Sequence, residues 1–145
     1  MTEKELFNLV LKGNVDAVAL IELLANACQV MDDIVDGDKP VTMEDKHSLF
    51  WNLLVTLPNN RFYQAHFMRL SPVISSALND WFVANRMESK DGPSAVAYVI
   101  RNNLINVLNE MVFLVGGYDH LKQYAVTLRQ YVHGNETLDE YIREY

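Results

Sequence analysis

Helix start and stop signals divide this sequence into segments of helical length, and they constrain the fold more than any other feature. Thr2 with Glu5 and Thr42 with Asp45 form capping-box patterns, in which a hydroxyl and a carboxylate satisfy free backbone N–H groups at a helix start. No stretch alternates apolar and polar residues with period two for long enough to predict a strand. The sequence therefore predicts an all-α fold, a compact bundle of about seven or eight helices in a single domain over residues 1–145.

The predicted helices begin and end at residues that cap or break helices. Asn14 is expected to cap a long helix that ends near Asp36, before Gly37. A second long helix is expected after Pro93, closed by Gly116 and Gly117. The remaining predicted helices cover residues 3–13, 43–57, 61–70, 72–87, 118–132 and 138–145, with Ser71 and Pro72 opening the fourth of these.

Composition excludes several classes of partner. The chain carries 12 Lys and Arg against 19 Asp and Glu, a net charge of −7, which disfavours nucleic acid and anionic membrane surfaces. Glu22 and Asn26 interrupt the longest apolar run before it reaches the length of a bilayer. The acidic first ten residues do not resemble a signal peptide. We therefore expect a cytoplasmic protein with no membrane or nucleic-acid partner, in which the single cysteine, Cys28, is a small core residue.

A narrow polar stripe runs along the long helix predicted from Asn14 to Asp36. At 100° per residue its members fall within an arc of about 80°, with Asp32 at the edge. So narrow a stripe predicts a buried helix with one side open to solvent, to a cleft or to a partner. The residues of the stripe, of which the first three are candidate cleft residues, are Glu22, Asn26, Gln29, Asp33 and Asp36.

Asp32, Asp33 and Asp36 place carboxylates at a helix C-terminus, where the helix dipole disfavours negative charge by a few tenths to ~1 kcal/mol each. Two interpretations remain open. A divalent cation such as Mg²⁺ could bind these hard oxygen ligands, with Asp32 and Asp36 one turn apart. Alternatively, the acids form a solvated helix end, with Lys39 as the compensating charge.

The helix predicted after Pro93 carries a second stripe. Asn102, Asn106 and Glu110 are spaced four apart and would share one face. Asparagine is a weak helix former, so its repeated use favours partners for the amide groups. Interhelical hydrogen bonding is the favoured interpretation, and ligand binding is the alternative.

Two short segments resemble the metal-binding motifs of class I isoprenoid synthases. "DDIVD", from Asp32 to Asp36, resembles the first aspartate-rich motif of that family. "NNLINVLNE", from Asn102 to Glu110, is similar to the second metal motif of terpene cyclases, with Asn in place of Asp at its second position and in place of Ser or Thr at its fifth. The resemblance implies Mg²⁺ bound to a substrate diphosphate, with ligands among Asp32, Asp33, Asp36, Asn102, Asn106 and Glu110.

The arrangement "DDIVDGDKPV" followed by "LPNNRFYQAHFMRLSPVI" is similar to short all-helical proteins of tailed bacteriophages. This resemblance implies a phage origin and leaves the activity open. Arg101 and Lys39 are the candidates to contact a phosphate, and no catalytic residue is assigned.

Trp51 and Trp81 are expected in the core.

Two hypotheses of function follow. The first is a Mg²⁺-dependent protein that acts on or binds a diphosphate compound, similar to an isoprenoid synthase or to an all-helical nucleotide pyrophosphohydrolase. It requires the two stripes to share one cleft, with Asp33 or Asp36 within about 10 Å of Asn106 or Glu110. The second is a non-enzymatic helical protein that binds a host or phage protein. Several almost wholly apolar helices in a short chain also favour a homodimer.

Overall fold

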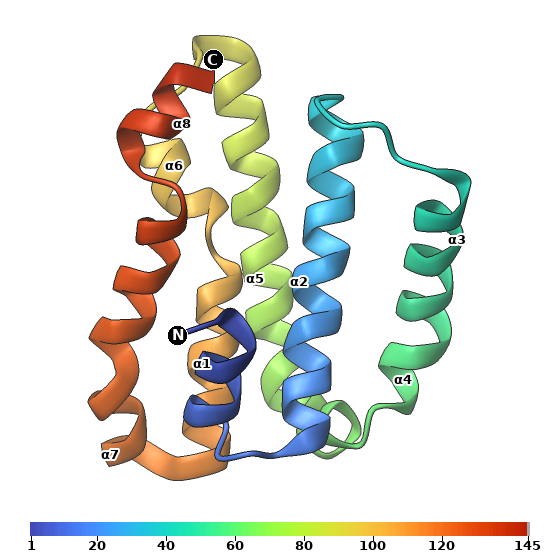
Figure 1. Ribbon diagram of the computed structural model, residues 1–145, viewed down its shortest axis with the longest axis vertical. Helices are drawn as coiled ribbons and strands as arrows, with labels where there is room; N and C mark the ends of the chain where they lie inside the picture. The colour runs from blue at the N-terminus through green and yellow to red at the C-terminus, as the bar shows by residue number, and fades with distance from the viewer. Residues whose placement is uncertain (145) are drawn as a thin grey trace. The chain divides into compact units, whose positions relative to one another are not determined.

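The computed structural model describes residues 1–144 and is all-helical, with no strand among these residues, as predicted (Figure 1). Within the same residues no helix has both the length and the apolar composition needed to cross a membrane. Tyr145, the last residue of the last predicted helix, lies outside the described part. The elements are α1 (Glu3–Val10), α2 (Val15–Asp36), α3 (Met43–Trp51), the π-helical segment η1 (Asn52–Thr56), α4 (Leu57–Asn59), α5 (Arg61–Asp91), α6 (Ala95–Arg101), α7 (Leu104–Asn135) and α8 (Leu138–Glu144).

The predicted number of helices, seven or eight, is slightly too high. Segments α3, η1 and α4 follow one another without a break, and α6 and α7 are separated by a turn of two residues. Counted this way, the described residues form six helical stretches. The all-α class is correct, and the error lies in where one helix gives way to the next.

The chain divides into two compact units, Met1–Phe67 and Met68–Tyr145. The first contains α1 to α4 and the first turns of α5, and the second contains the rest of α5 with α6, α7 and α8. The expectation of a single domain over residues 1–145 stays a prediction.

Predicted caps fix the helix starts of the first unit. The hydroxyls of Thr2 and Thr42 each accept a hydrogen bond from the backbone N–H three residues later. The backbone N–H of each threonine donates in return to the carboxylate of that later residue, so both capping boxes are present. Asn14 caps α2 by accepting from the Ala17 N–H at 3.0 Å. Helix α1 packs against α2. The buried side chains of these two helices and their linker are Leu6, Phe7, Val10, Leu11, Ala17, Val18, Leu20, Ile21, Leu24 and Ala27.

Burial along α2 stops at Ala27. Beyond that residue the apolar side chains of the helix are half-exposed, with Ile34 at 43% and Val35 at 51% of their full exposure. The first two thirds of α2 therefore build the core, and the last two turns extend out of it. The Asp-rich segment lies on this outer part.

Helix α5 does not break where the sequence predicts. The predicted boundary was Ser71 with Pro72, but the helix continues through Pro72. The irregular residue is His66, with φ −120° and ψ 18°. A proline inside a helix removes one backbone hydrogen bond and crowds the preceding turn, which can kink a helix without ending it. The irregular residue lies six residues before the proline, so α5 departs from helical geometry ahead of Pro72 and not at it.

In the second unit, the predicted break at Gly116 and Gly117 is confirmed as a sharp kink inside α7. Gly117 has φ +85° and ψ −171°, a backbone conformation that side-chain-bearing residues avoid. The chain reverses direction there, and the two arms of α7 are visible in Figure 1. Helices α6 and α8 pack together, and the buried cluster at this end consists of Ala84, Ala97, Tyr98 and Tyr141.

Candidate functional site

The carboxylates of the Asp-rich segment lie in the last two turns of α2. Asp32 and Asp33 are half-buried, and Asp36 is exposed. The side-chain amide of Gln29 donates a hydrogen bond to Asp33 Oδ1 at 3.1 Å. Gly37 ends the helix in the left-handed conformation, and its N–H donates to the Asp33 carbonyl at 3.0 Å. Among the described residues of α2, the last turn contains no basic side chain.

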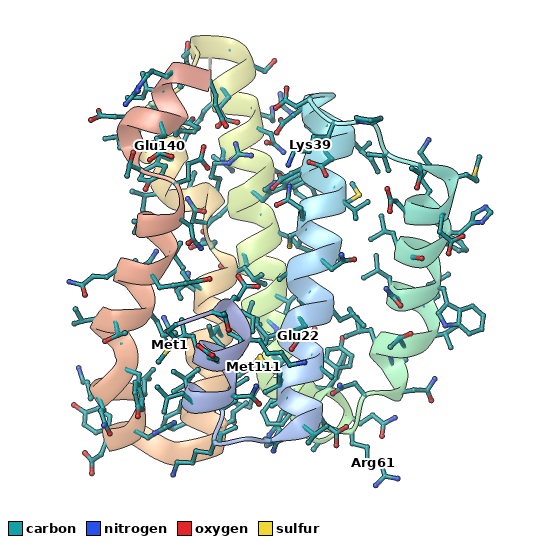
Figure 2. All side chains as sticks on the ribbon, in the orientation of Figure 1. Met1, Glu22, Lys39, Arg61, Met111 and Glu140 are labelled. Atoms are coloured by element: carbon teal, nitrogen blue, oxygen red, sulfur yellow. The ribbon has the colours of Figure 1, made fainter. Side chains whose placement is uncertain are left out.

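The rest of the predicted stripe lies on the exposed side of the same helix, since Glu22, Asn26 and Gln29 are all exposed. Figure 2 shows Glu22 on α2 and Lys39 beyond the C-terminal end of that helix. Across residues 1–144, His, Cys, Asp and Glu side chains do not gather in threes or more as a ready-made metal site. Binding of Mg²⁺ by Asp32, Asp33 and Asp36 stays a prediction.

Cys28 lies one turn before Asp32 and is half-buried. Burial, and then the neighbouring Asp32 carboxylate, raise the pKa of its thiol to about 11. The thiol therefore stays protonated near neutral pH, which makes it a poor nucleophile and a poor metal ligand. The prediction that Cys28 is a small core residue is met only in part, since its side chain is half-buried at the margin of the core.

The second stripe does not lie on one helix, and the prediction of a continuous helix after Pro93 is wrong. Asn102 ends α6, and Asn103 occupies the two-residue turn before α7. The Asn103 amide, 9% exposed, donates to an Asp80 carboxylate oxygen on α5 and accepts from Asn106 Nδ2 at 2.8 Å. The bond from Asn103 to Asp80 is interhelical, as the favoured interpretation predicts, whereas the Asn102 amide donates to the Tyr98 carbonyl of its own helix at 2.7 Å. Asparagine side chains can hydrogen-bond to nearby backbone and side-chain groups in place of the helical pattern, which favours a turn at this point of the chain.

Arg101, a predicted phosphate ligand, takes part in a buried ion pair. Its Nη1 atom lies 2.5 Å from both carboxylate oxygens of Glu88 on α5, and the two side chains are 11% and 5% exposed. The Tyr141 hydroxyl of α8 donates to Glu88 Oε2 at 2.6 Å. The pair thus ties α5, α6 and α8 together, and no local pattern in the sequence points to it. A phosphate-binding role for Arg101 stays a prediction.

Glu110, the last residue of the terpene-cyclase-like motif, pairs with Arg69. The distance from Glu110 Oε1 to Arg69 Nη2 is 2.6 Å, and the arginine side chain is 58% exposed. The same guanidinium lies over the ring of Phe113, 5.5 Å from its centre. The stripe of α2 and the segment from Asn102 to Glu110 belong to different units. A metal site shared between them stays a prediction.

A second buried polar group surrounds the start of α8. The Tyr98 hydroxyl donates to the Glu136 carbonyl at 2.5 Å. Burial raises the pKa of the Glu136 carboxyl to about 7, and the nearby Glu144 carboxylate, which hydrogen-bonds it, adds to the shift. Glu140 acts in the same direction, while Arg101 lowers this pKa. The linker between α7 and α8 therefore holds a carboxyl group that ionises near neutral pH.

The most unusual surface in the first unit belongs to α3 and η1. Within residues 43–59, all of which the structure describes, no side chain is buried. Large apolar residues on one side of this helix face solvent, with Phe50, Trp51 and Leu54 at 70%, 62% and 60% exposure. We call this surface the α3 face, and it consists of Met43, His47, Phe50, Trp51 and Leu54.

The opposite side of the segment contains its half-buried residues. These are Ser48, Leu49, Asn52 and Val55, and α3 packs against α2. The segment therefore turns a side of two polar and two aliphatic residues towards its neighbour, and a side containing phenylalanine and tryptophan towards solvent. A helix that served only the core of its own unit would have the reverse orientation. A shallow hollow of about 360 Å³ lies on the α3 face, lined by Lys46, His47, Phe50 and Trp51.

The prediction that Trp51 lies in the core is wrong. Its spacing from Met43, His47, Phe50 and Leu54 is that of an ordinary apolar helix face. Periodicity identifies such a face but does not say whether the same chain covers it. The sequence therefore predicts the apolar face of this helix but does not predict that the face is exposed.

Comparisons with protein-family models, with curated proteins and with solved structures find no match for this chain.

Proposed function

We propose that this chain is a non-enzymatic helical protein that binds another protein chain through the α3 face. The observation that carries the proposal is the orientation of the α3–η1 segment, whose aromatic side is exposed and whose mixed polar side packs inward. The sequence analysis gives two protein partners for such a role, a host or phage protein and a second copy of the chain.

The size of the exposed surface supports the proposal. Met43, Phe50, Trp51 and Leu54 are 60–70% exposed. With side-chain areas of roughly 150–250 Å² for the aromatic residues, and somewhat less for the others, they expose on the order of 500 Å² of largely apolar surface. An area of this size equals the largest apolar patch of a typical monomer, and such a patch often serves in binding. Burying them against a partner would remove that area from water.

Site-specific photo-crosslinking tests the proposal. A photoreactive phenylalanine analogue at Phe50 should form covalent adducts with a protein in the cells that naturally contain the chain. The matched control is the same analogue at Val15, an apolar residue of the same unit that is 79% exposed and lies off the α3 face. Adducts at position 50 and none at position 15 are expected. No adduct at position 50, or equal yields at the two positions, would contradict the proposal.

A second candidate function is Mg²⁺-dependent binding of a diphosphate compound by Asp32, Asp33 and Asp36. The observation that favours it is the concentration of carboxylates in the last turns of α2, at a helix end where the dipole opposes them and where the described last turn contains no basic residue. Mg²⁺ takes one or two carboxylates together with water and phosphate oxygens, so a diphosphate would complete its coordination. Lys39 is the neighbouring cation for the phosphate.

Thermal melting with Mg²⁺ and pyrophosphate tests this second function. A ligand at a hundred times its Kd raises the free energy of unfolding by about 2.7 kcal/mol, so the melting temperature of the wild type should rise. The Asp33→Asn, Asp36→Asn double variant should show no rise. An Asp119→Asn, Asp139→Asn variant removes the same charge from exposed positions elsewhere and should respond like the wild type. An unchanged wild-type melting temperature would exclude the site.

A further inference from the structure

We infer that the α3 face is the contact of a symmetric homodimer, in which the α3–η1 segment of one copy packs antiparallel against the same segment of a second copy. This inference rests on the proposed protein-binding function and names the partner. It follows from the distribution of charge along the segment, from the positions of its aromatic residues and from the area that the face exposes.

The charges around the α3 face allow a second copy to approach there and favour one direction of the pair. The chain has a net charge of −7, so two copies repel one another over most of their surface. Around the α3 face the charges balance, because Glu44 and Asp45 are offset by Lys46 and by Arg61, the next charged residue along the chain. The acids lie in the first turn of α3, and Arg61 lies just beyond α4.

An antiparallel arrangement places the acidic start of each segment beside the basic end of the other. A parallel arrangement would instead bring Glu44 and Asp45 of both copies together. Opposed helix dipoles add to the preference for the antiparallel pair, since each negative helix end then lies beside a positive one. A two-fold axis across the segment therefore gives a favourable arrangement of both the charged side chains and the helix dipoles.

The positions of the large side chains suit the same axis. If the axis crosses the segment between residues 50 and 51, Phe50 of each copy lies opposite Trp51 of the other, and His47 lies opposite Leu54. Two aromatic pairs then form the centre of the contact, where offset or edge-to-face packing is favourable. Leu54 of each copy lies over the hollow lined by Lys46, His47, Phe50 and Trp51 of the other.

The available area is sufficient for a stable contact. Each copy contributes on the order of 500 Å² of largely apolar surface from the α3 face, and the polar residues at its margins add to this. The total for two copies is then about 1,000 Å² or more, which is the lower limit for a specific protein interface.

Sedimentation equilibrium tests the partner and the face. The wild type should be a dimer at micromolar concentration, and Phe50→Asp should weaken self-association at least tenfold. The matched control, Val15→Asp, places the same charge on another exposed apolar position and should leave the dimer unchanged. Because the α3–η1 segment buries no side chain in its own unit, the Phe50→Asp variant should retain its helical circular dichroism. A wild type that is monomeric at about 100 µM, or a Phe50→Asp dimer as tight as the wild type, would overturn the inference.

Disulfide trapping tests the antiparallel geometry. A mixture of His47→Cys and Leu54→Cys chains should form a mixed disulfide under mild oxidation, because these positions lie opposite one another. His47→Cys alone should not crosslink efficiently, since the two copies of position 47 would be about 10 Å apart along the helix axis, beyond disulfide reach. The wild type, with Cys28, provides the baseline. Efficient crosslinking of His47→Cys alone would indicate a parallel pair and overturn the antiparallel arrangement.

The crosslinking experiment at Phe50 separates this inference from the proposed function. The chain has a mass of 16.6 kDa, so a self-adduct has twice that mass and yields peptides of this sequence only. A Phe50 adduct that contains a different protein and no self-adduct would leave the proposed function in place and overturn the homodimer.

Discussion

Replacing Arg101 with methionine should lower the free energy of unfolding by about 3–5 kcal/mol, the range for removing one partner of a buried ion pair. The interior position of the pair sets this magnitude, since Glu88 and Arg101 are 5% and 11% exposed. The variant would leave the Glu88 carboxylate in the interior, with the Tyr141 hydroxyl as a hydrogen-bond donor at 2.6 Å. For a chain of about 150 residues each kcal/mol lowers the melting temperature by about 2–4 °C, so the midpoint should fall by on the order of 10 °C. Urea unfolding followed by circular dichroism measures the loss.

A matched arginine substitution provides the control. Arg69→Met breaks an ion pair of the same type with Glu110, but Arg69 is 58% exposed, so the loss should be about 1 kcal/mol or less. The double variant Arg101→Met, Glu88→Leu removes both buried charges and should recover most of the loss, apart from the hydrogen bond of Tyr141. A loss of stability for Arg101→Met no larger than that for Arg69→Met would refute the assigned strength of the buried pair. So would a double variant whose loss of stability equals the sum of the losses for Arg101→Met alone and Glu88→Leu alone.

Two further predictions concern the second unit. Gly117→Ala should destabilise the chain by about 1–3 kcal/mol, because an alanine at φ +85° and ψ −171° is strained; Gly134→Ala, in open space at the end of α7, should be neutral or stabilise by up to about 1 kcal/mol in the same unfolding assay. The second prediction concerns Glu136, whose pKa is raised from 4.5 to about 7, so the stability it contributes is full below pH 4.5 and is lost as the pH rises through 7. Glu136→Gln should therefore flatten the decline in stability across this window, and unfolding curves of both proteins at several pH values measure the difference. Parallel pH profiles would contradict the assignment.

Local rules predicted the starts of α1, α2 and α3 because the interactions involved span only a few residues. Thr2 and Thr42 form their capping boxes within one turn, and Asn14 caps α2 through a backbone N–H three residues away. Gly37 and Gly117 adopt backbone conformations that glycine alone tolerates well. For the three caps the sequence contains both hydrogen-bonding partners within three residues. For the two glycines the residue itself is the signal, so neighbouring residues were sufficient in all five cases.

The interior of the second unit was not predicted because its partners are distant in sequence. Glu88 contacts Arg101 thirteen residues later and Tyr141 fifty-three residues later. Asn103 leaves the helical pattern because Asp80, twenty-three residues earlier, accepts a hydrogen bond from its side chain. No spacing rule connects these residues. The apolar spacing of the α3 face was visible in the sequence, but only the structure shows which side of that helix is covered.

The π turn of η1 makes the length of this segment as important as its composition. Residues Asn52–Thr56 form i to i+5 hydrogen bonds, as in the contact from the Leu57 N–H to the Asn52 carbonyl, so this turn contains one residue more than an α-helical turn. Deleting one residue from η1 would restore α-helical geometry and leave the segments before and after it close to their present rotation, because the wide turn takes up the extra residue. A one-residue deletion within α3, which has no such turn, would instead rotate the residues on its two sides by about 100° relative to one another. Related chains that use the α3 face should therefore tolerate the loss of one residue between residues 52 and 56 better than a one-residue deletion within α3.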